Sequence, residues 1–198
     1  DPTFGADPYC SKDATAAFQS AIDVCYQHGC GTVFAPSGCY RFDGTLLIHD
    51  GVALQGDWQP PGSTTSASGT VLAGVVAESP GLGLEGTPFL SLCASASVQY
   101  LTIRYESQQL QSSGNTGVVV YPPTISAARQ LECSAGRLAG ILIRKVTLLN
   151  SYVGIRSSGR DGTVTQYFHV TEIYGTPLKT GIVRVLLSVT TLLSIGFE

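Results

Sequence analysis

The sequence predicts an all-β protein, a right-handed parallel β-helix closed at its N-terminal end by an amphipathic capping helix. Three observations predict this fold. A single clear helical pattern stands near the N-terminus, the segments after it alternate between short strands and turns, and strand-like phrases recur at a loose period. Periods of about 20 to 50 residues are typical of solenoids, whose coils bury their apolar side only by stacking on neighbours. At 198 residues, we expect one domain.

The predicted helix covers residues 13–28. Four of its residues share one face at the spacing i, i+3, i+4, i+7: Phe18, Ala21, Ile22 and Cys25. Ser11 or Asp13 can cap its start, and Gly29 can end it in the left-handed conformation. The first coil of a solenoid exposes an open edge and an apolar core end. Residues 1–44 are therefore expected to form an N-terminal cap.

Residues 45–198 are expected to form the coils, interrupted by a long loop at about 59–69. Three segments look like the same rung of successive coils: Val98–Ile103, Ile143–Leu148 and His169–Tyr174. Gly140, Gly154 and Gly181, each followed by Ile, look like recurring corners. Val146 and Val170 stand 24 residues apart, and Gly154 and Gly181 stand 27 apart. A sandwich of antiparallel hairpins is the rival architecture, but the tight Asn-Gly turns it prefers are missing.

Composition narrows the function classes. Charged residues make up 13% of the chain, the net charge is −3, and no basic patch of the kind that nucleic-acid binding needs is present. No apolar run reaches the roughly 18 residues of a membrane span. The chain begins Asp1-Pro2 and holds no Met, which favours a processed, secreted product.

Six cysteines also favour an oxidising compartment. They show no CxxC spacing and only three His accompany them, so we predict no metal site. An even count in a chain of low charge is typical of disulfides, with buried free thiols as the alternative. Four of the six precede residue 40, so disulfides are expected to staple the cap.

Four segments carry a resemblance to a known family: Phe4–Asp7, Ser11–Asp23, Gly31–Phe42 and Val52–Trp58. Together they resemble the opening of the pectate lyase superfamily of pectin lyase-like β-helix proteins, which includes glycoside hydrolases and some phage tailspikes. The likeness covers about the first 60 residues well. It implies the fold and a carbohydrate-active role, but not the reaction, because the same cap serves lyases, hydrolases and binding fibres.

The later chain departs from this family. Relatives often carry an aromatic-Tyr-Pro-Glu element where this chain has Arg104–Ser107, and Tyr-Pro-Trp where it has Tyr121–Pro123. Family enzymes usually run to several hundred residues, so we expect a truncated or divergent member. Val185–Phe197 carries no charge, and self-association through an exposed C-terminal coil is expected there.

Cleaving a glycosidic bond needs one of two constellations. A hydrolase uses two carboxyls about 5 to 9.5 Å apart. A lyase needs a base beside the uronate carboxylate, plus a cation that stabilises the developing charge. The candidate catalytic residues are Glu106, Glu172 and Asp161. Asp161 lies in a turn where Asp is ordinary, and Glu172 faces away from the apolar side of its strand only if a bend intervenes.

The residues expected to bind a glycan combine aromatic rings with charges: Trp58, Asp57, Tyr105, Tyr121, Arg104, Arg156 and Lys179. Trp58 could stack on a sugar ring while Asp57 accepts from its hydroxyls. In the alternative interpretation Trp58 plugs a turn and Asp57 caps backbone N–H groups. Lys145 is a further candidate base, although strand alternation would let only one of Arg144 and Lys145 face a groove.

The sequence thus predicts a secreted protein that acts on a polysaccharide, as a glycoside hydrolase or polysaccharide lyase. A non-catalytic glycan-binding or assembly module is the alternative, and an excised fragment without its own role is a third. No cofactor is expected, except Ca²⁺ if the protein is a lyase. Nucleic acid and membrane are not expected partners.

Overall fold

A computed structural model describes residues 4–60, 68–74, 86–106, 108, 121–127, 133, 139–157, 167–177, 180–184 and 193–195. In these residues the protein has one helix, α1 (Thr15–Gln27). Its strands are β1 (Tyr9–Asp13), β2 (Thr32–Phe34), β3 (Gly38–Phe42), β4 (Leu46–Ile48), β5 (Ala53–Gln55), β6 (Thr70–Gly74), β7 (Leu90–Leu92), β8 (Ser97–Tyr105), β9 (Pro123–Ser126), β10 (Leu142–Leu149), β11 (Val153–Ser157), β12 (His169–Thr176), β13 (Thr180–Arg184) and β14 (Leu193–Ile195).

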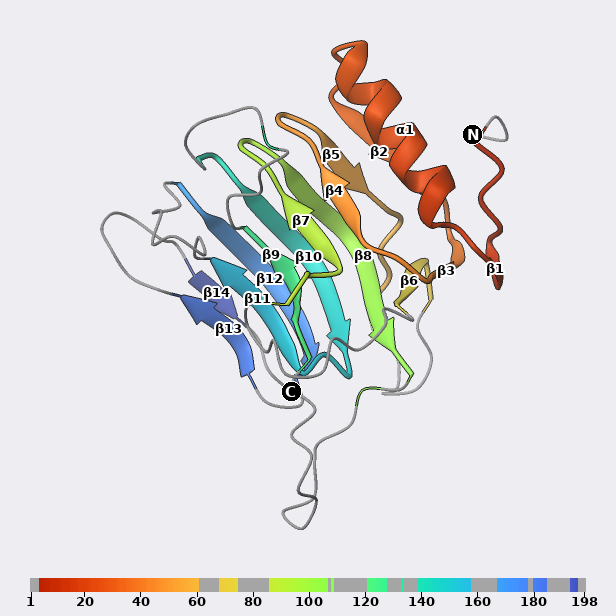
Figure 1. Ribbon diagram of the computed structural model, residues 1–198. Helices are drawn as coiled ribbons and strands as arrows, with labels where there is room; N and C mark the ends of the chain where they lie inside the picture. The colour runs from red at the N-terminus through yellow and green to blue at the C-terminus, as the bar shows by residue number, and fades with distance from the viewer. Residues whose placement is uncertain are drawn as a thin grey trace.

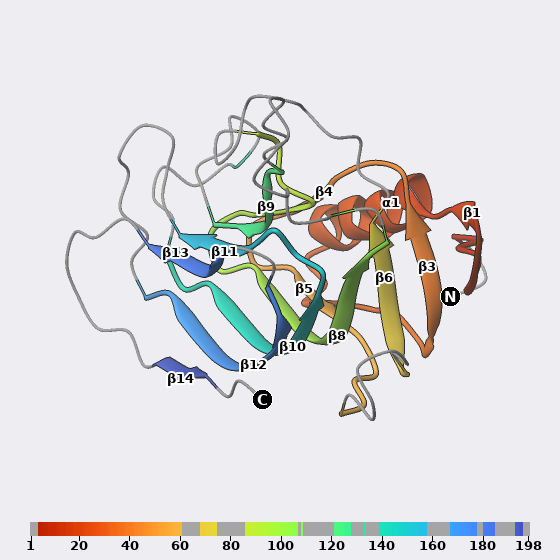
Figure 2. The same ribbon diagram turned by 90° about the horizontal axis from the view of Figure 1, so that it is seen from below.

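The strands form two sheets, and neighbours in each sheet run parallel. Sheet A has the order β1-β3-β6-β8-β10-β12-β14, with β2 and β5 joined to the side of β8, and sheet B has the order β13-β11-β9-β7-β4. The chain passes from one sheet to the other and back, so the two sheets face each other across the molecule (Figures 1 and 2). Crossovers between parallel strands are right-handed in nearly all proteins. The predicted parallel β-helix is confirmed.

The strand register corrects one sequence spacing. Val98 pairs with Ile143, and Ile143 pairs with Val170, so the coil from β10 to β12 contains 27 residues. Val146 pairs with Ile173 and not with Val170, which makes the spacing of 24 wrong. The apolar residues recur every two or three positions along each strand, so a slip of one to three residues still looks regular in sequence.

Two bends recur in the coils, and both use left-handed backbone. The first precedes the strands of sheet A, at Gly51, Ser95, Gly140 and Tyr167, which all have positive φ. The second lies inside sheet A, at Tyr100 (φ 57°), Lys145 (φ 49°) and Glu172 (φ 55°). The register places these three residues in one column, because their neighbours on both sides pair across the strands.

Of the three predicted glycine corners, the structure confirms only Gly140. Gly154 and Gly181 lie opposite each other within β11 and β13. A Cβ at Gly154 would come 2.4 Å from the Gly181 carbonyl oxygen. These glycines therefore allow a close approach of two strands rather than a turn.

Helix α1 matches the predicted helix within two residues at each end. Its buried residues are Phe18, Ile22 and Cys25. The N-cap residue is Ala14, which has no side-chain cap hydrogen bond, while the carboxylate of Asp13 just before it accepts from the backbone N–H of Thr15 at 2.9 Å. Gly29 has the predicted left-handed conformation. The helix packs on β2 and β4 at the N-terminal end of the coils (Figure 1). Among the described residues, no helix is long and apolar enough to cross a membrane.

The cap and the coils share one core. Edge-to-face aromatic contacts run from α1 into the coils: Phe18 to Phe42 (5.0 Å), Phe42 to Phe89 (5.3 Å) and Phe89 to Tyr105 (6.3 Å). Leu90, Ile125 and Ile155 continue the core along sheet B. Each of these contacts joins a helix or strand to an element from a different coil, so the cap closes the core as expected.

Three disulfides are present: Cys10–Cys39, Cys25–Cys30 and Cys93–Cys133. Two of them lie in the first 39 residues, which confirms the stapled cap. The first joins β1 to β3, and the second joins α1 to the segment before β2. The alternative of free thiols is wrong for these six cysteines.

Candidate functional site

Aromatic and charged side chains gather in one cluster on the outer face of sheet A. We call this cluster the platform. Its members are Trp58, Tyr100, Arg144, Lys145, Thr147, Glu172 and Tyr174. Three strands, β8, β10 and β12, supply six of these residues, and the segment between β5 and β6 supplies Trp58.

The side chain of Trp58 lies over β10 and β12, which belong to later coils than Trp58 itself. Its indole N–H donates to the Thr147 hydroxyl at 3.0 Å, and its ring stacks on Tyr174 with centroids 5.2 Å apart and planes 29° apart. Thr147 and Tyr174 are paired neighbours in β10 and β12. The indole therefore forms an aromatic pair with Tyr174 over two adjacent strands, and such a pair offers an apolar ring surface of the kind that can hold a pyranose.

The carboxylate of Glu172 forms ion pairs with both cations of the platform, Arg144 and Lys145. Its carboxylate lies 3.4 Å from the Arg144 guanidinium and 3.4 Å from the Lys145 ammonium. The same ammonium stands 5.6 Å from the centroid of the Trp58 ring and 5.9 Å from that of Tyr100. With two cations and one carboxylate, the platform carries a net positive charge and favours an anionic ligand.

The bend in sheet A explains why both Arg144 and Lys145 reach Glu172. In a regular strand consecutive side chains point to opposite faces. The left-handed backbone at Lys145 breaks this alternation, so the expectation that only one of the two faces the site is wrong. The sequence predicted that Glu172 faces away from the apolar side of β12 only if the strand bends. The strand does bend, at the left-handed backbone of Glu172 itself. Left-handed non-glycine residues carry strain of order 1–3 kcal/mol and cluster at functional sites.

The predicted pair Glu106 and Glu172 is not brought together. Glu106 follows the end of β8 and its side chain, 75% exposed, pairs with Arg104 at 2.9 Å. Glu172 aligns with Tyr100, six residues earlier in β8 and two strands away. At about 3.3 Å per residue, the backbone positions of these two residues stand roughly 20 Å apart along the strand direction alone. They are therefore too distant to act as one acid and base pair on a glycosidic bond.

Tyr105 is a correction to the predicted glycan contacts. Its side chain is 3% exposed and packs against Phe89 in the core, where burial raises the pKa of its hydroxyl above the usual value of 10.0. A ring enclosed by protein on this scale cannot stack on a sugar. Strand alternation explains the error, because Tyr105 continues the inward series of Leu101 and Ile103.

Asp57 turns away from the platform although Trp58 lies on it. The Asp57 carboxylate accepts a short hydrogen bond from the Ser37 hydroxyl, which belongs to the preceding coil. Its backbone N–H donates to the Thr70 hydroxyl at 2.8 Å. The carboxylate here accepts from a side-chain hydroxyl and not from a backbone N–H, so the capping role of the alternative interpretation stays a prediction.

Tyr121 and Arg156 lie at sheet B, apart from the platform. Tyr121 packs on Tyr152 with ring centroids 5.5 Å apart, and both rings are buried. Arg156 pairs in register with Ser126 and is 9% exposed. Arg104 is at the end of β8, and Asp161 and Lys179 lie outside the described residues. The predicted site residues thus fall in several places rather than in one groove.

Sequence reasoning missed Tyr100, Arg144, Thr147 and Tyr174 as members of the site. The available signal was the strand repeat, which aligns Tyr100 with Lys145. Starting the third strand one residue early, at His169 instead of Val170, placed Glu172 outside this column. Within the described chain, no three His, Cys, Asp or Glu side chains are grouped so as to hold a metal ion.

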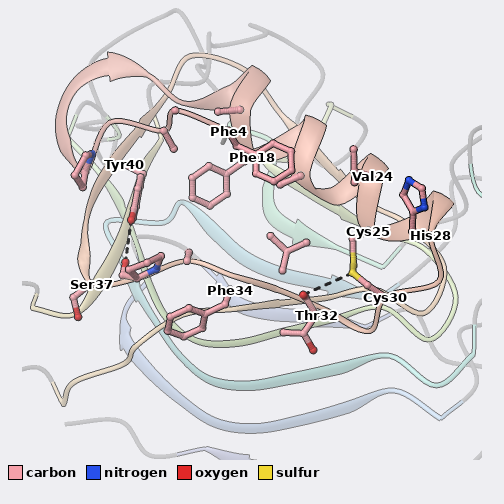
Figure 3. A pocket seen from close by; sticks show the side chains of 18 residues that line it. Phe4, Phe18, Val24, Cys25, His28, Cys30, Thr32, Phe34, Ser37 and Tyr40 are labelled. Atoms are coloured by element: carbon pink, nitrogen blue, oxygen red, sulfur yellow. Dashed lines mark hydrogen bonds between the residues drawn. A yellow bond between two sulfur atoms is a disulfide. The ribbon is translucent and has the colours of Figure 1, made fainter. Parts of the chain in front are cut away.

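A large cavity lies elsewhere, between α1 and the strands β2 and β3, with a volume of about 710 Å³ (Figure 3). Phe18, Val24 and Phe34 contribute to its mainly apolar lining. The lining includes no Asp, Glu, Lys or Arg side chain among the described residues. It therefore lacks the groups that either glycan-cleaving reaction requires.

Part of the chain is similar in sequence to two mannuronan C5-epimerases. Mannuronan C5-epimerase AlgE1 of Azotobacter vinelandii is 44% identical over 61 residues, covering 27% of this chain and 4% of the epimerase. Mannuronan C5-epimerase AlgE4 of the same organism is 43% identical over 60 residues, covering 27% of this chain and 11% of the epimerase. The matches therefore span only a small part of these relatives' length.

Two solved structures are similar to most of the chain. Iota-carrageenase complexed to iota-carrageenan fragments aligns with a TM-score of 0.49 at 13% identity, covering 87% of this chain and 34% of that one. The A-module of the AlgE4 epimerase from Azotobacter vinelandii aligns with a TM-score of 0.40 at 17% identity, covering 92% and 54%. The family profile described as rhamnogalacturonase A/epimerase, pectate lyase-like matches residues 2–185, nearly the whole chain. The protein belongs to this pectate lyase-like family of carbohydrate-active β-helix proteins.

Proposed function

We propose that the protein is secreted and acts on an acidic, uronate-containing polysaccharide, which it binds on the platform. One observation carries this proposal: an aromatic pair, Trp58 and Tyr174, lies beside two cations that share a single carboxylate. The rings offer the apolar surface for a sugar. When the sugar binds, Arg144 and Lys145 release the carboxylate of Glu172 and pair instead with the carboxylate of the sugar.

The proposed reaction begins with removal of the proton next to the uronate carboxylate. Elimination then cleaves the chain, whereas return of the proton on the other face inverts the carbon. The names of the curated relatives, mannuronan C5-epimerases, support this class. Hydrolysis by Glu106 and Glu172 has no geometric support, since they stand about 20 Å apart. On the platform, Lys145, Glu172 and the hydroxyls of Tyr100 and Tyr174 are the groups that can exchange a proton with a bound sugar.

The experiment is a polymer panel of mannuronan, polygalacturonate and neutral dextran. Binding is followed by the fluorescence of Trp58, the only tryptophan of the chain. Chain cleavage is followed by unsaturated-uronate absorbance and reducing ends, and inversion by proton NMR. We expect saturable binding of at least one acidic polymer, weakened by salt, and none of dextran. Equal binding of dextran, or no binding of either acidic polymer, would contradict the proposal.

A non-catalytic role is the second candidate, in which the protein binds glycan or assembles without turnover. It is favoured by the internal pairing of the platform charges and by the ends of the sheets. Among the described strands, β14 pairs only with β12, and β13 only with β11. An edge strand of this kind can pair with another chain. Sedimentation that depends on concentration, together with binding and no reaction product, would establish this role.

Secretion is supported by the three disulfides, which form and persist in oxidising compartments. Protein taken from its natural source is expected to show no free thiol after denaturation in the presence of an alkylating reagent. Labelling of all six cysteines would contradict a secreted location.

A further inference from the structure

Trp58 reaches the platform from the base of a hairpin, which the described residues 56–60 and 68–69 form between β5 and β6. Trp58 and Gly69 form an antiparallel bridge, and the backbone N–H of Thr70 donates to the Asp57 carbonyl at 2.8 Å. Gly69 has a φ of +80°, and a Cβ there would come 2.0 Å from the Asp57 carbonyl oxygen. The two hairpin strands therefore come together closely at Asp57, which is the root of the hairpin.

The root is tied to the coil before it, away from the platform. The Asp57 carboxylate accepts from the Ser37 hydroxyl, in the link between β2 and β3. The Thr70 hydroxyl, which accepts from the Asp57 backbone N–H, donates to the carbonyl of Ala35 at 2.7 Å. Backbone of one coil thus holds the root of a hairpin that belongs to the next coil.

The indole of Trp58 projects from this root onto the platform. Thr147 and Tyr174, which it contacts, belong to β10 and β12, two and three strands along sheet A from β6. Trp58 directly follows Asp57 in the chain and pairs with Gly69 at the root. A change of the backbone at Asp57 therefore changes the direction in which the indole projects.

We propose that Asp57 is a positioning residue, whose hydrogen bond with Ser37 fixes the hairpin so that the indole of Trp58 stays on the platform. This goes beyond a turn-capping role, because the effect is exerted on a side chain that contacts the glycan. It rests on the proposed function only for the effect on glycan binding. The position of the indole can be measured without any ligand.

The test compares Asp57→Ala with Asp57→Asn, whose amide oxygen can still accept from Ser37. Trp58 is the only reporter of its kind in the chain, so its emission is assigned without ambiguity. In Asp57→Ala we expect emission at longer wavelength, about twofold greater quenching by acrylamide and about tenfold weaker binding of mannuronan. In Asp57→Asn we expect values close to the parent protein. Asp43→Ala is the matched control, since Asp43 is an exposed aspartate paired with Arg41.

Ser37→Ala removes the same hydrogen bond from the other side and should reproduce the emission and quenching of Asp57→Ala. It also keeps the test decisive if Asp57→Ala does not fold. Unchanged emission and quenching in Ser37→Ala, or an asparagine variant as altered as the alanine variant, would overturn the proposal. If the parent protein binds no acidic polymer, the proposed function fails, whereas the emission comparison still decides the role of Asp57.

Discussion

Single residues with left-handed backbone decide the chemistry of the platform. Tyr100, Lys145 and Glu172 adopt this conformation in three successive strands of sheet A. For a residue with a Cβ it costs about 1–2 kcal/mol. At Lys145 and Glu172 the strain is accompanied by the ion pair between them and by contacts of the ammonium with two rings. The bend thereby gathers charges that a straight strand would distribute over both faces.

Glu172→Gln is the sharpest single-residue test of what the platform does. The change removes the carboxylate that competes with an acidic polymer for Arg144 and Lys145. We therefore expect mannuronan to bind about three- to tenfold more tightly in equilibrium titrations. If the protein turns the polymer over and Glu172 carries a proton, product formation should fall even as binding strengthens.

The control for this change is Asp43→Asn, which removes an exposed carboxylate remote from the platform and should alter neither quantity. Weaker binding by Glu172→Gln than by the control would show that Glu172 contacts the ligand favourably rather than competing with it.

At the scale of the strands, close backbone contact helps to hold neighbours together, in addition to the packing of apolar side chains. β11 and β13 approach at Gly154 and Gly181, while Ile155 and Ile182 on the same strands pair in register. Small residues opposite each other permit this approach, and branched residues beside them fill the interior. At Gly154 and Gly181 the sequence phrase Gly-Ile therefore marks a position in a strand, whereas at Gly140 it marks a corner.

Gly154→Ala should destabilise the protein by at least about 2 kcal/mol, because the new methyl group would stand 2.4 Å from the Gly181 carbonyl oxygen. Gly31→Ala is the matched control. A Cβ at Gly31 meets nothing within 4 Å, and its effect should stay within about 0.5 kcal/mol. Urea unfolding followed by circular dichroism measures both. Equal midpoints for the two variants would contradict the close approach of β11 and β13.

At the scale of the whole molecule, the cap and coils behave as one stacked array. Coils of a solenoid contact mainly their neighbours, so an exposed end is a point of weakness. Here α1 covers that end, the aromatic series continues from Phe18 to Tyr105, and Cys10–Cys39 fastens β1 to β3. Stability of the first coils should therefore depend on this disulfide.

Replacing Cys10 and Cys39 together by Ser should lower the free energy of unfolding by about 3.5 kcal/mol, since the bridge spans 29 residues of sequence. The Cys25–Cys30 bridge spans only 5, and its removal should cost about 1.5 kcal/mol less. Guanidinium unfolding of both double variants measures the difference. A larger loss from the shorter bridge would indicate that the cap is held mainly by α1 and not by β1.

The sequence by itself determined the parallel β-helix, the capping helix with Phe18 and Ile22 inward, and the oxidised cap. These properties depend on the local spacing of apolar residues, on helix-capping residues and on the number of cysteines, all of which can be read from the sequence. Trp58 and Glu172 were also identified as candidates, since a lone Trp beside an acid and an acid within a strand are unusual locally.

Only the tertiary structure decided which of the candidates meet. Register fixes the partners of each strand, and a shift of one residue at His169 or of three at Val170 changes every one of them. The left-handed bend at Lys145 overrides strand alternation, and the Trp58 hairpin places an early residue beside β10 and β12. Such contacts join residues as far apart in sequence as Trp58 and Tyr174, and their geometry is set by stacking of whole coils, which no local pattern encodes.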